Sequence, residues 1–207
     1  MIIYGIYTKI DMILSEDSIA SHIPYYLTED AKQGLLKELS DFPEKINYYT
    51  TRYPNDILQG DGMAGLQIIN FDSGERKFTK GILLSNSCDI DTGNYRDLPI
   101  KMTFAPLIKI DKYTDLLIKK GIDKDKIDGK IRSIKEQKVT HIFFLPKNDK
   151  LDADYMALLS DLQTVPLNYV SKNPRCEKLF TLSQVGFYMF IFKLSVHFCR
   201  FHENVAR

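Results

Sequence analysis

The sequence predicts an α+β protein in which short antiparallel strands form a small barrel flanked by helices. Apolar segments of strand length alternate with Gly, Asp and Asn turns through residues 57–111, and strand signals return at residues 139–170. Between them, residues 112–138 are rich in charge and carry apolar side chains at helical spacing. A long amphipathic pattern follows at residues 181–204. A barrel interrupted by a helical insert and followed by a long helix accounts for this order.

Turn residues divide the barrel region into strands. The segments 72–74 and 91–94 are rich in Asp, Gly and Asn, which favour tight turns because they tolerate or stabilise the backbone angles required. The polar stretch 147–152 has the same role later in the chain. The expected strands are 66–71, 80–85, 100–110, 139–145 and 155–170.

Helical patterns lie before, within and after the barrel. In the N-terminal arm, residues 1–56, Thr28 precedes two acidic residues as an N-cap, and a helix runs to Pro43 before an extended stretch. The insert divides into two helices at residues 121–123. The C-terminal helix is predicted from one apolar face, which carries Phe187, Phe190, Ile191, Leu194, Phe198 and Phe201.

Composition places the chain among folded globular proteins of one domain. Its 207 residues are 44% hydrophobic and 27% charged, and no linker or repeat divides them, so residues 1–207 are expected to form a single domain. The 28 basic residues nearly balance the 27 acidic ones. Since no global field attracts nucleic acid or a membrane, any nucleic-acid site has to be local.

The first residues and the cysteines favour a cytoplasmic location. The N-terminal segment has no leading basic region, and charges soon interrupt its apolar run, so secretion is not expected. Cys88, Cys176 and Cys199 are an odd number spread far apart, which suits a reducing compartment. The most apolar stretch, 185–199, is shorter than the ~20 residues that a membrane helix needs, so no membrane association is expected.

Five short strand-and-turn motifs follow one another between residues 59 and 107. They are Gln59-Gly60-Asp61, Ile68-Ile69-Asn70-Phe71, Ser73-Gly74-Glu75, Lys80-Gly81-Ile82-Leu83-Leu84-Ser85-Asn86 and Phe104-Ala105-Pro106-Leu107. In order and spacing they resemble the MazF/PemK-like toxin family, and Asp161-Leu162-Gln163 is a fainter later match. The resemblance implies an SH3-like antiparallel barrel, and it implies RNA cleavage as the activity of the family.

Two positions depart from the family's pattern. Where the family has Arg-Pro before the apolar strand, this chain has Lys80-Gly81, and lysine lacks the forked donors that bind a phosphate bidentately. Where the family has Thr after Pro-Ile, Ile108 has no hydroxyl. Glu75 keeps its place, and Arg76 and Lys77 are available to replace the lost cation. If cleavage survives, the resemblance assigns Glu75 as base, Arg76 as phosphate clamp and Lys80 as charge stabiliser.

The densest polar cluster directly follows an apolar strand, which is where binding loops usually lie. Cys88 has three open alternatives: a nucleophile activated by His141, a zinc ligand beside carboxylates, or a packed residue at the end of the strand. The neighbouring Asn and Asp residues fit turn formation as well as binding. The candidate binding residues are Ser85, Asn86, Cys88, Asp89 and Asp91.

Other candidate surfaces each have a structural alternative. The tyrosine-rich segment 48–53 could stack on single-stranded nucleic acid or form an edge strand over the barrel. The lysines of the insert could form a basic face, but interleaved acidic residues favour a solvated surface. His197 and His202 are five residues apart, which does not suit a helical metal site. The sequence therefore predicts no metal and no cofactor.

These observations favour a non-catalytic binding or regulatory protein of a bacterial toxin–antitoxin or defence system. The expected recognition surface combines the loop from Ser85 to Asp91 with the turn from Glu75 to Lys80. Its expected partner is RNA or a protein, and the second face of the final helix could support a homodimer. The alternative is a metal-independent endoribonuclease that uses Glu75, Arg76 and Lys80.

Overall fold

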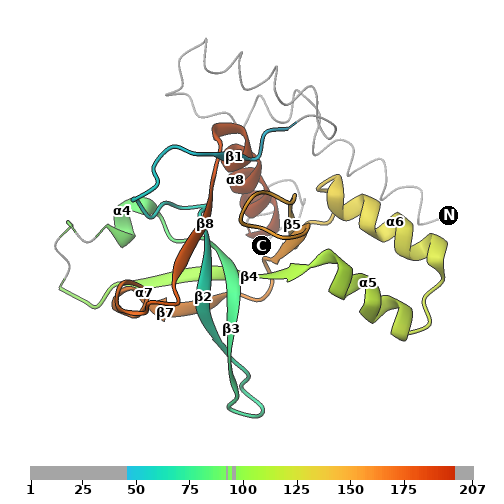
Figure 1. Cartoon of the computed structure of the whole chain (residues 1–207), viewed down its shortest axis with the longest axis horizontal. Coiled ribbons are helices and arrows are strands. Elements are labelled where there is room, and N and C mark those ends of the chain that lie inside the picture. Colours follow the sequence, from blue (N-terminus) through green and yellow to red (C-terminus); the bar gives the residue numbers. More distant parts are fainter. Residues whose placement is uncertain (1–45, 92, 95–96, 199–207) are drawn as a thin grey trace, which may run out of the picture.

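The computed structural model describes residues 46–91, 93–94 and 97–198. Strands and helices are mixed along the chain (Figure 1). The strands are β1 (Tyr49–Thr50), β2 (Gly62–Ile69), β3 (Arg76–Leu83), β4 (Lys101–Lys109), β5 (Ile142–Leu145), β6 (Tyr155–Leu158), β7 (Gln163–Pro166) and β8 (Glu177–Leu182). The helices are α4 (Ser87–Ile90), α5 (Ile110–Lys119), α6 (Lys124–Lys135), α7 (Leu167–Lys172) and α8 (Gln184–Phe198).

One curled antiparallel sheet forms a half-barrel. Its strand order is β1-β8-β2-β3-β4-β6-β5, and β7 also pairs with β4. β4 pairs with three strands: residues 104–106 pair with β3, residues 101–104 with β7 and residues 107–109 with β6. β2 and β3 form a hairpin that projects beyond the rest of the sheet (Figure 1). The sheet therefore brings together segments that are far apart in the sequence.

Two hydrophobic cores lie against the sheet. The larger core joins β5 and β6 to α8, where the ring centroids of Phe143 and Phe190 are 5.2 Å apart. The smaller core lies where β2, β3 and β4 meet β7 and α7, around the fully buried Leu66, Leu83 and Phe104. Apolar burial stabilises such cores by about 25 cal/mol per Å² removed from water. Among the described residues, no helix combines the length and the apolar character needed to cross a membrane.

Among the residues that the structure describes, the charged side chains of Asp61 and Lys193 are buried with polar partners. Asp61 is 0% exposed, and its Oδ2 lies 2.7 Å from Lys178 Nζ and accepts from the backbone N–H of Leu58 at 2.8 Å. On α8, Lys193 is buried and donates to the backbone carbonyl of Gln137. These bonds stabilise polar groups that would otherwise destabilise the cores.

The structure confirms the fold class at the level of a mixed α+β protein with a curled antiparallel sheet. The charged insert forms two helices, α5 and α6, as predicted. They are separated at residues 120–123, and the predicted break was at residues 121–123. The C-terminal helix is present as α8, and its predicted extension to residue 204 lies outside the described residues. The predicted N-terminal helix also lies outside them.

Several local predictions were wrong. Residues 155–170 do not form one strand: the pairing with β4 changes register between β6 and β7, and the segment then continues into α7. Part of the predicted loop is the short helix α4. The C-terminal helix begins at residue 184 and not at 181, because residues 181–182 belong to β8, a strand that the sequence analysis missed.

Candidate functional site

The predicted binding loop lies beyond β3 and uses several polar side chains to stabilise its own backbone. Ser85 Oγ accepts a hydrogen bond of 2.8 Å from a backbone N–H of β4. Asn86 caps α4, because its Oδ1 accepts from the N–H of Cys88 at 2.9 Å. Asp91 Oδ1 accepts from a nearby backbone N–H at 2.8 Å. The turn-forming alternative therefore holds for Asn86 and Asp91.

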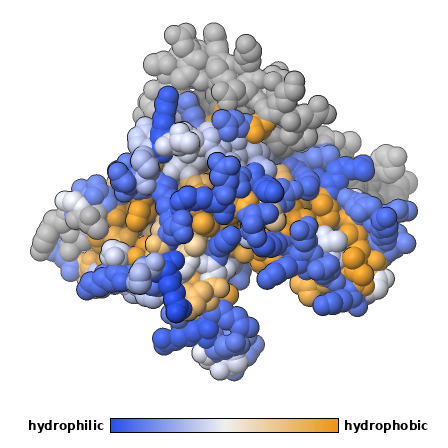
Figure 2. Space-filling model, in the orientation of Figure 1, coloured by the Kyte–Doolittle hydropathy of each residue, from blue (hydrophilic) through white to orange (hydrophobic). Residues whose placement is uncertain are grey.

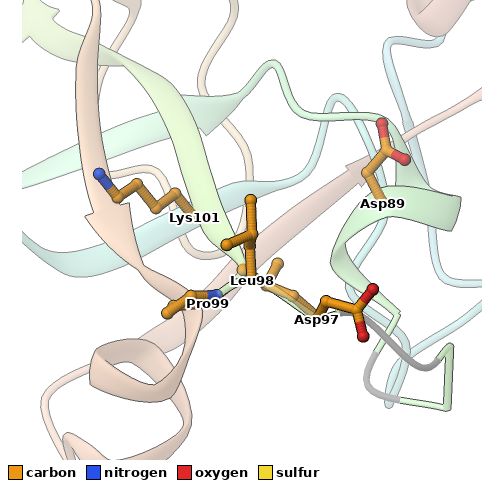
Figure 3. Close-up of a pocket in the computed structure, with 6 residues that line it drawn as sticks. Asp89, Asp97, Leu98, Pro99 and Lys101 are labelled. Carbon is orange, nitrogen blue, oxygen red and sulfur yellow. The ribbon is translucent and has the colours of Figure 1, made fainter.

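A shallow hollow adjoins this loop (Figure 3). Asp89 on α4 lines one side, and the segment from Asp97 to Lys101 lines the rest. The hollow has a volume of about 410 Å³ and is open to solvent. In Figure 3 the two carboxylates lie to one side of Leu98 and the Lys101 side chain extends to the other. Cys88 is exposed on the same helix. The hollow thus presents separated charges and not a convergent set of catalytic groups.

Of the three residues that the family resemblance assigns to catalysis, Glu75 and Arg76 are neighbours in the chain, but Lys80 lies away from both. Glu75 is in the turn between β2 and β3, and its carboxylate pairs with Lys77 at 3.2 Å. Arg76 begins β3. Lys80 lies four residues further along, about 13 Å away at the rise of an extended strand. The turn at Glu75 and the loop at Ser85 lie at opposite ends of β3, so they do not form one surface.

One face of β3 combines cations with an aromatic ring. Arg76, Phe78 and Lys80 occupy alternate positions, so their side chains project from the same face of the strand. Phe78 is 51% exposed, and the guanidinium carbon of Arg175 lies 4.5 Å from its ring centroid. Figure 2 shows hydrophilic atoms around a smaller hydrophobic patch over this hairpin. A planar guanidinium over an exposed ring forms a flat, positively charged surface.

A bulge in β2 brings Arg175 to this face. The pairing of β2 with β3 shifts register between Met63 and Leu66, and Gly65 within the bulge has a φ of +72°. A Cβ atom at Gly65 would lie 2.1 Å from the carbonyl oxygen of Arg175. Because only glycine has no Cβ, it alone allows the segment before β8 to approach β2 so closely.

Lys80 also belongs to a charged network that reaches β4 and β6. Its Nζ donates to the Tyr155 hydroxyl at 3.1 Å and lies 3.5 Å from Asp152 Oδ1. The Tyr155 hydroxyl donates to the same carboxylate oxygen at 2.7 Å. Lys109 Nζ pairs with the other oxygen, Oδ2. Lys109 and Tyr155 are direct register partners, so strand pairing holds them side by side.

The network keeps Asp152 ionised and Tyr155 protonated. Hydrogen bonds from Lys109 and Tyr155 lower the pKa of Asp152 well below its ordinary value, and the bond to Asp152 raises the pKa of Lys109. Burial, with the bond to Asp152, raises the pKa of Tyr155 to about 12. The surface remains positive with Asp152 included. We call it the cationic face and define it by Arg76, Phe78, Lys80, Lys109 and Arg175.

Two members of the cationic face were predicted from the sequence as site residues, and three were not. Arg76 and Lys80 were singled out through the family resemblance. Phe78 lies between them with strand periodicity, so the alternation of residue types was an available signal. Lys109 and Arg175 reach this face only through the pairing of β4 with β6 and the approach to Gly65. No sequence spacing encodes these two contacts.

The other predicted surfaces have structural roles where the structure describes them. Tyr48 packs in the larger core, and Tyr49 pairs with β8 in a two-residue edge strand, so the edge-strand alternative holds there. In the insert, Lys135 pairs with Asp154 at 2.7 Å. Within the described ranges, no group of three His, Cys, Asp or Glu side chains is arranged to hold a metal ion, and His202 lies outside them.

No protein-family model matches the chain, and no curated protein matches it either. The resemblance to the MazF/PemK-like family therefore rests only on the five motifs and the fainter match at residues 161–163.

Proposed function

We propose that the protein is a non-catalytic binding protein that holds single-stranded RNA on the cationic face. The observation that carries the proposal is the alternation of Arg76, Phe78 and Lys80 on one face of β3, with Arg175 stacked on Phe78. Single-stranded nucleic acids are bound by cations that contact the phosphates and by exposed rings that stack on the bases, and this face supplies both. The MazF/PemK-like resemblance favours RNA over DNA as the ligand.

The two parts of the cationic face have different tasks in this proposal. Phe78 and Arg175 form the stacking platform, and stacking of a base on an aromatic side chain contributes about 1–3 kcal/mol. Lys80 and Lys109 contact phosphate as point charges. Tyr155 is only 4% exposed, so it positions the two lysines and does not stack on a base.

The separation of the predicted catalytic residues supports binding without cleavage. Metal-independent cleavage needs a base and a cation at the same phosphate. Glu75 and Lys80, the assigned base and charge stabiliser, are about 17 Å apart along an extended strand, and the Glu75 carboxylate is already paired with Lys77 on β3. Asp152 and Tyr155 are weak substitutes as bases, because the pKa of the acid is lowered and the phenol is protonated at neutral pH.

An SH3-like barrel related to the MazF/PemK-like family is part of the same proposal. The arrangement of the motifs supports it: Gln59-Gly60-Asp61 leads into β2, the motif that begins at Lys80 runs through the end of β3, and Phe104 to Leu107 lie on the neighbouring β4. These three motifs therefore belong to three consecutive antiparallel strands.

Fluorescence anisotropy with a labelled single-stranded RNA of mixed sequence tests the proposed function. The double variant Lys80→Gln/Lys109→Gln should bind roughly tenfold more weakly at low salt, because it removes two cations that neutralise phosphates. The matched control is Lys119→Gln/Lys120→Gln, which makes the same change in net charge at the exposed end of α5 and should bind within about twofold of the wild type. Equal weakening by the two pairs would contradict the cationic face.

Gel electrophoresis of the same RNA separates binding from cleavage. Intact RNA after incubation, with and without chelator, is the expected result. Cleavage that is lost in Glu75→Ala/Lys80→Ala would establish the endoribonuclease alternative instead.

A further inference from the structure

Lys80, Lys109 and the Tyr155 hydroxyl all contact the carboxylate of Asp152. Lys80 and Lys109 belong to the cationic face, and Tyr155 lies beside it. Lys109 Nζ pairs with Asp152 Oδ2, and Oδ1 accepts from the Tyr155 hydroxyl at 2.7 Å and lies 3.5 Å from Lys80 Nζ. These donors come from three neighbouring strands of one sheet, β3, β4 and β6. Their geometry is therefore set by strand pairing and not by the acid that they surround.

Asp152 is more exposed to solvent than the two lysines that contact it. The side chain of Asp152 is 58% exposed, whereas Lys80 and Lys109 are 30% and 32% exposed. Asp152 also lies in the connection between β5 and β6 and not on a strand. Water screens ion pairs as exposed as these, so each contributes little to stability. Asp152 can thus leave its partners at little cost to the fold.

We infer that Asp152 occupies the position of a ligand phosphate and lowers RNA affinity by competing for Lys80 and Lys109. A carboxylate and a phosphate are both anionic acceptors with several oxygens, so the same ammonium and hydroxyl donors suit either. The inference rests on the proposed RNA-binding function and adds its regulation. The chemistry that is recognised is a phosphate group, supplied either by the RNA backbone or by a 5′-terminal phosphate.

The test compares Asp152→Asn with Asp149→Asn. Asp149 is an exposed acid of the same connection, so the two variants make the same change in net charge. Binding of the full chain to two otherwise identical single-stranded RNAs, one with a 5′-phosphate and one with a 5′-hydroxyl, is measured by anisotropy at several salt concentrations. Thermal unfolding checks that each variant is folded, and Asp152→Ser is a second variant should the first be unstable.

Asp152→Asn should bind RNA about three- to tenfold more tightly than the wild type, with a steeper salt dependence, because about one more phosphate is neutralised. Asp149→Asn should stay within about twofold. A gain in affinity confined to the 5′-phosphorylated RNA would show that the terminal phosphate binds in place of Asp152. An equal gain in affinity for both RNAs would show that a backbone phosphate binds there.

Equal effects of the two variants, with the wild type still binding, would overturn the role of Asp152 and leave the proposed function standing. No RNA binding by any variant would overturn both.

Discussion

A lysine inside the larger core makes the stability of the fold depend on pH. Lys193 on α8 is buried and donates to the backbone carbonyl of Gln137. Burial lowers its pKa from 10.5 to about 7, because an ammonium is poorly solvated there. Above pH 7 the folded protein therefore releases a proton that the unfolded chain keeps up to about pH 10.5.

The release of this proton should be measurable as a difference between wild type and Lys193→Met in how the free energy of unfolding depends on pH. Between pH 7 and 10.5 the unfolded state binds more protons, so the contribution of Lys193 to the free energy of unfolding rises with pH; below pH 7 both states are protonated and the contribution is constant. We expect the difference between wild type and variant to rise by roughly 2 kcal/mol between pH 6.5 and 9 in urea unfolding. Parallel stability profiles for the two proteins would show that Lys193 does not titrate in this range.

The buried pair of Asp61 and Lys178 gives a second prediction at the residue scale. Burial raises the pKa of Asp61 even though Lys178 donates to it, and Lys178 Nζ also donates to the carbonyls of Tyr53 and Asp56 at 2.8 and 2.7 Å. Asp61→Ala should lower the free energy of unfolding by about 3–5 kcal/mol, because it leaves a largely buried ammonium without its carboxylate. The double variant Asp61→Leu/Lys178→Met should lower the free energy of unfolding by clearly less than Asp61→Ala does. A larger loss in the double variant than in Asp61→Ala would contradict this account of the pair.

At the scale of elements, the bulge in β2 links stability to the cationic face. Gly65 and Gly74 both have positive φ, +72° and +68°, but a Cβ at Gly65 would meet the Arg175 carbonyl, whereas one at Gly74 has nothing within 4 Å. Gly74→Ala should cost about 1–2 kcal/mol from backbone strain alone, and Gly65→Ala should cost clearly more. Chemical denaturation measures both losses.

The same pair of variants reports on RNA binding. Gly65→Ala should also weaken RNA binding, because Arg175 has to move away from Phe78, while Gly74→Ala should leave affinity unchanged in the anisotropy assay. Equal losses of stability in the two variants would show that the contact with Arg175 does not constrain the bulge.

Elements with strong periodicity were predictable, and those shaped by pairing were not. The charged insert has apolar residues at helical spacing and a break from Gly121 to Asp123, so α5 and α6 could be predicted from the sequence. The division of residues 155–170 into β6, β7 and α7 depends on how each part pairs with β4, which no local pattern records. β8 was missed although Asn173-Pro174 is a turn signal shortly before it, because its last residues were assigned to the C-terminal helix.

At the scale of the whole molecule, the candidate site depends on the order of strands in the sheet. Sequence reasoning placed binding at Ser85 to Asp91, where polar residues cluster, but Asn86 and Asp91 bond to the nearby backbone. The cationic face gathers side chains from β3, β4 and the segment before β8. The predicted strand began at residue 80, so even the alternation of Arg76, Phe78 and Lys80 along β3 was not predicted. Contacts between distant segments follow from topology.

Crosslinking tests the central claim most directly. Ultraviolet irradiation of the full chain with single-stranded RNA, followed by digestion and mass spectrometry, locates the bases that stack on the protein. The account predicts that crosslinked peptides contain Phe78 and that Phe78→Ala removes them. Crosslinks that lie only in the α5–α6 insert or in the 97–101 segment beside the hollow, with none in β3, would contradict it.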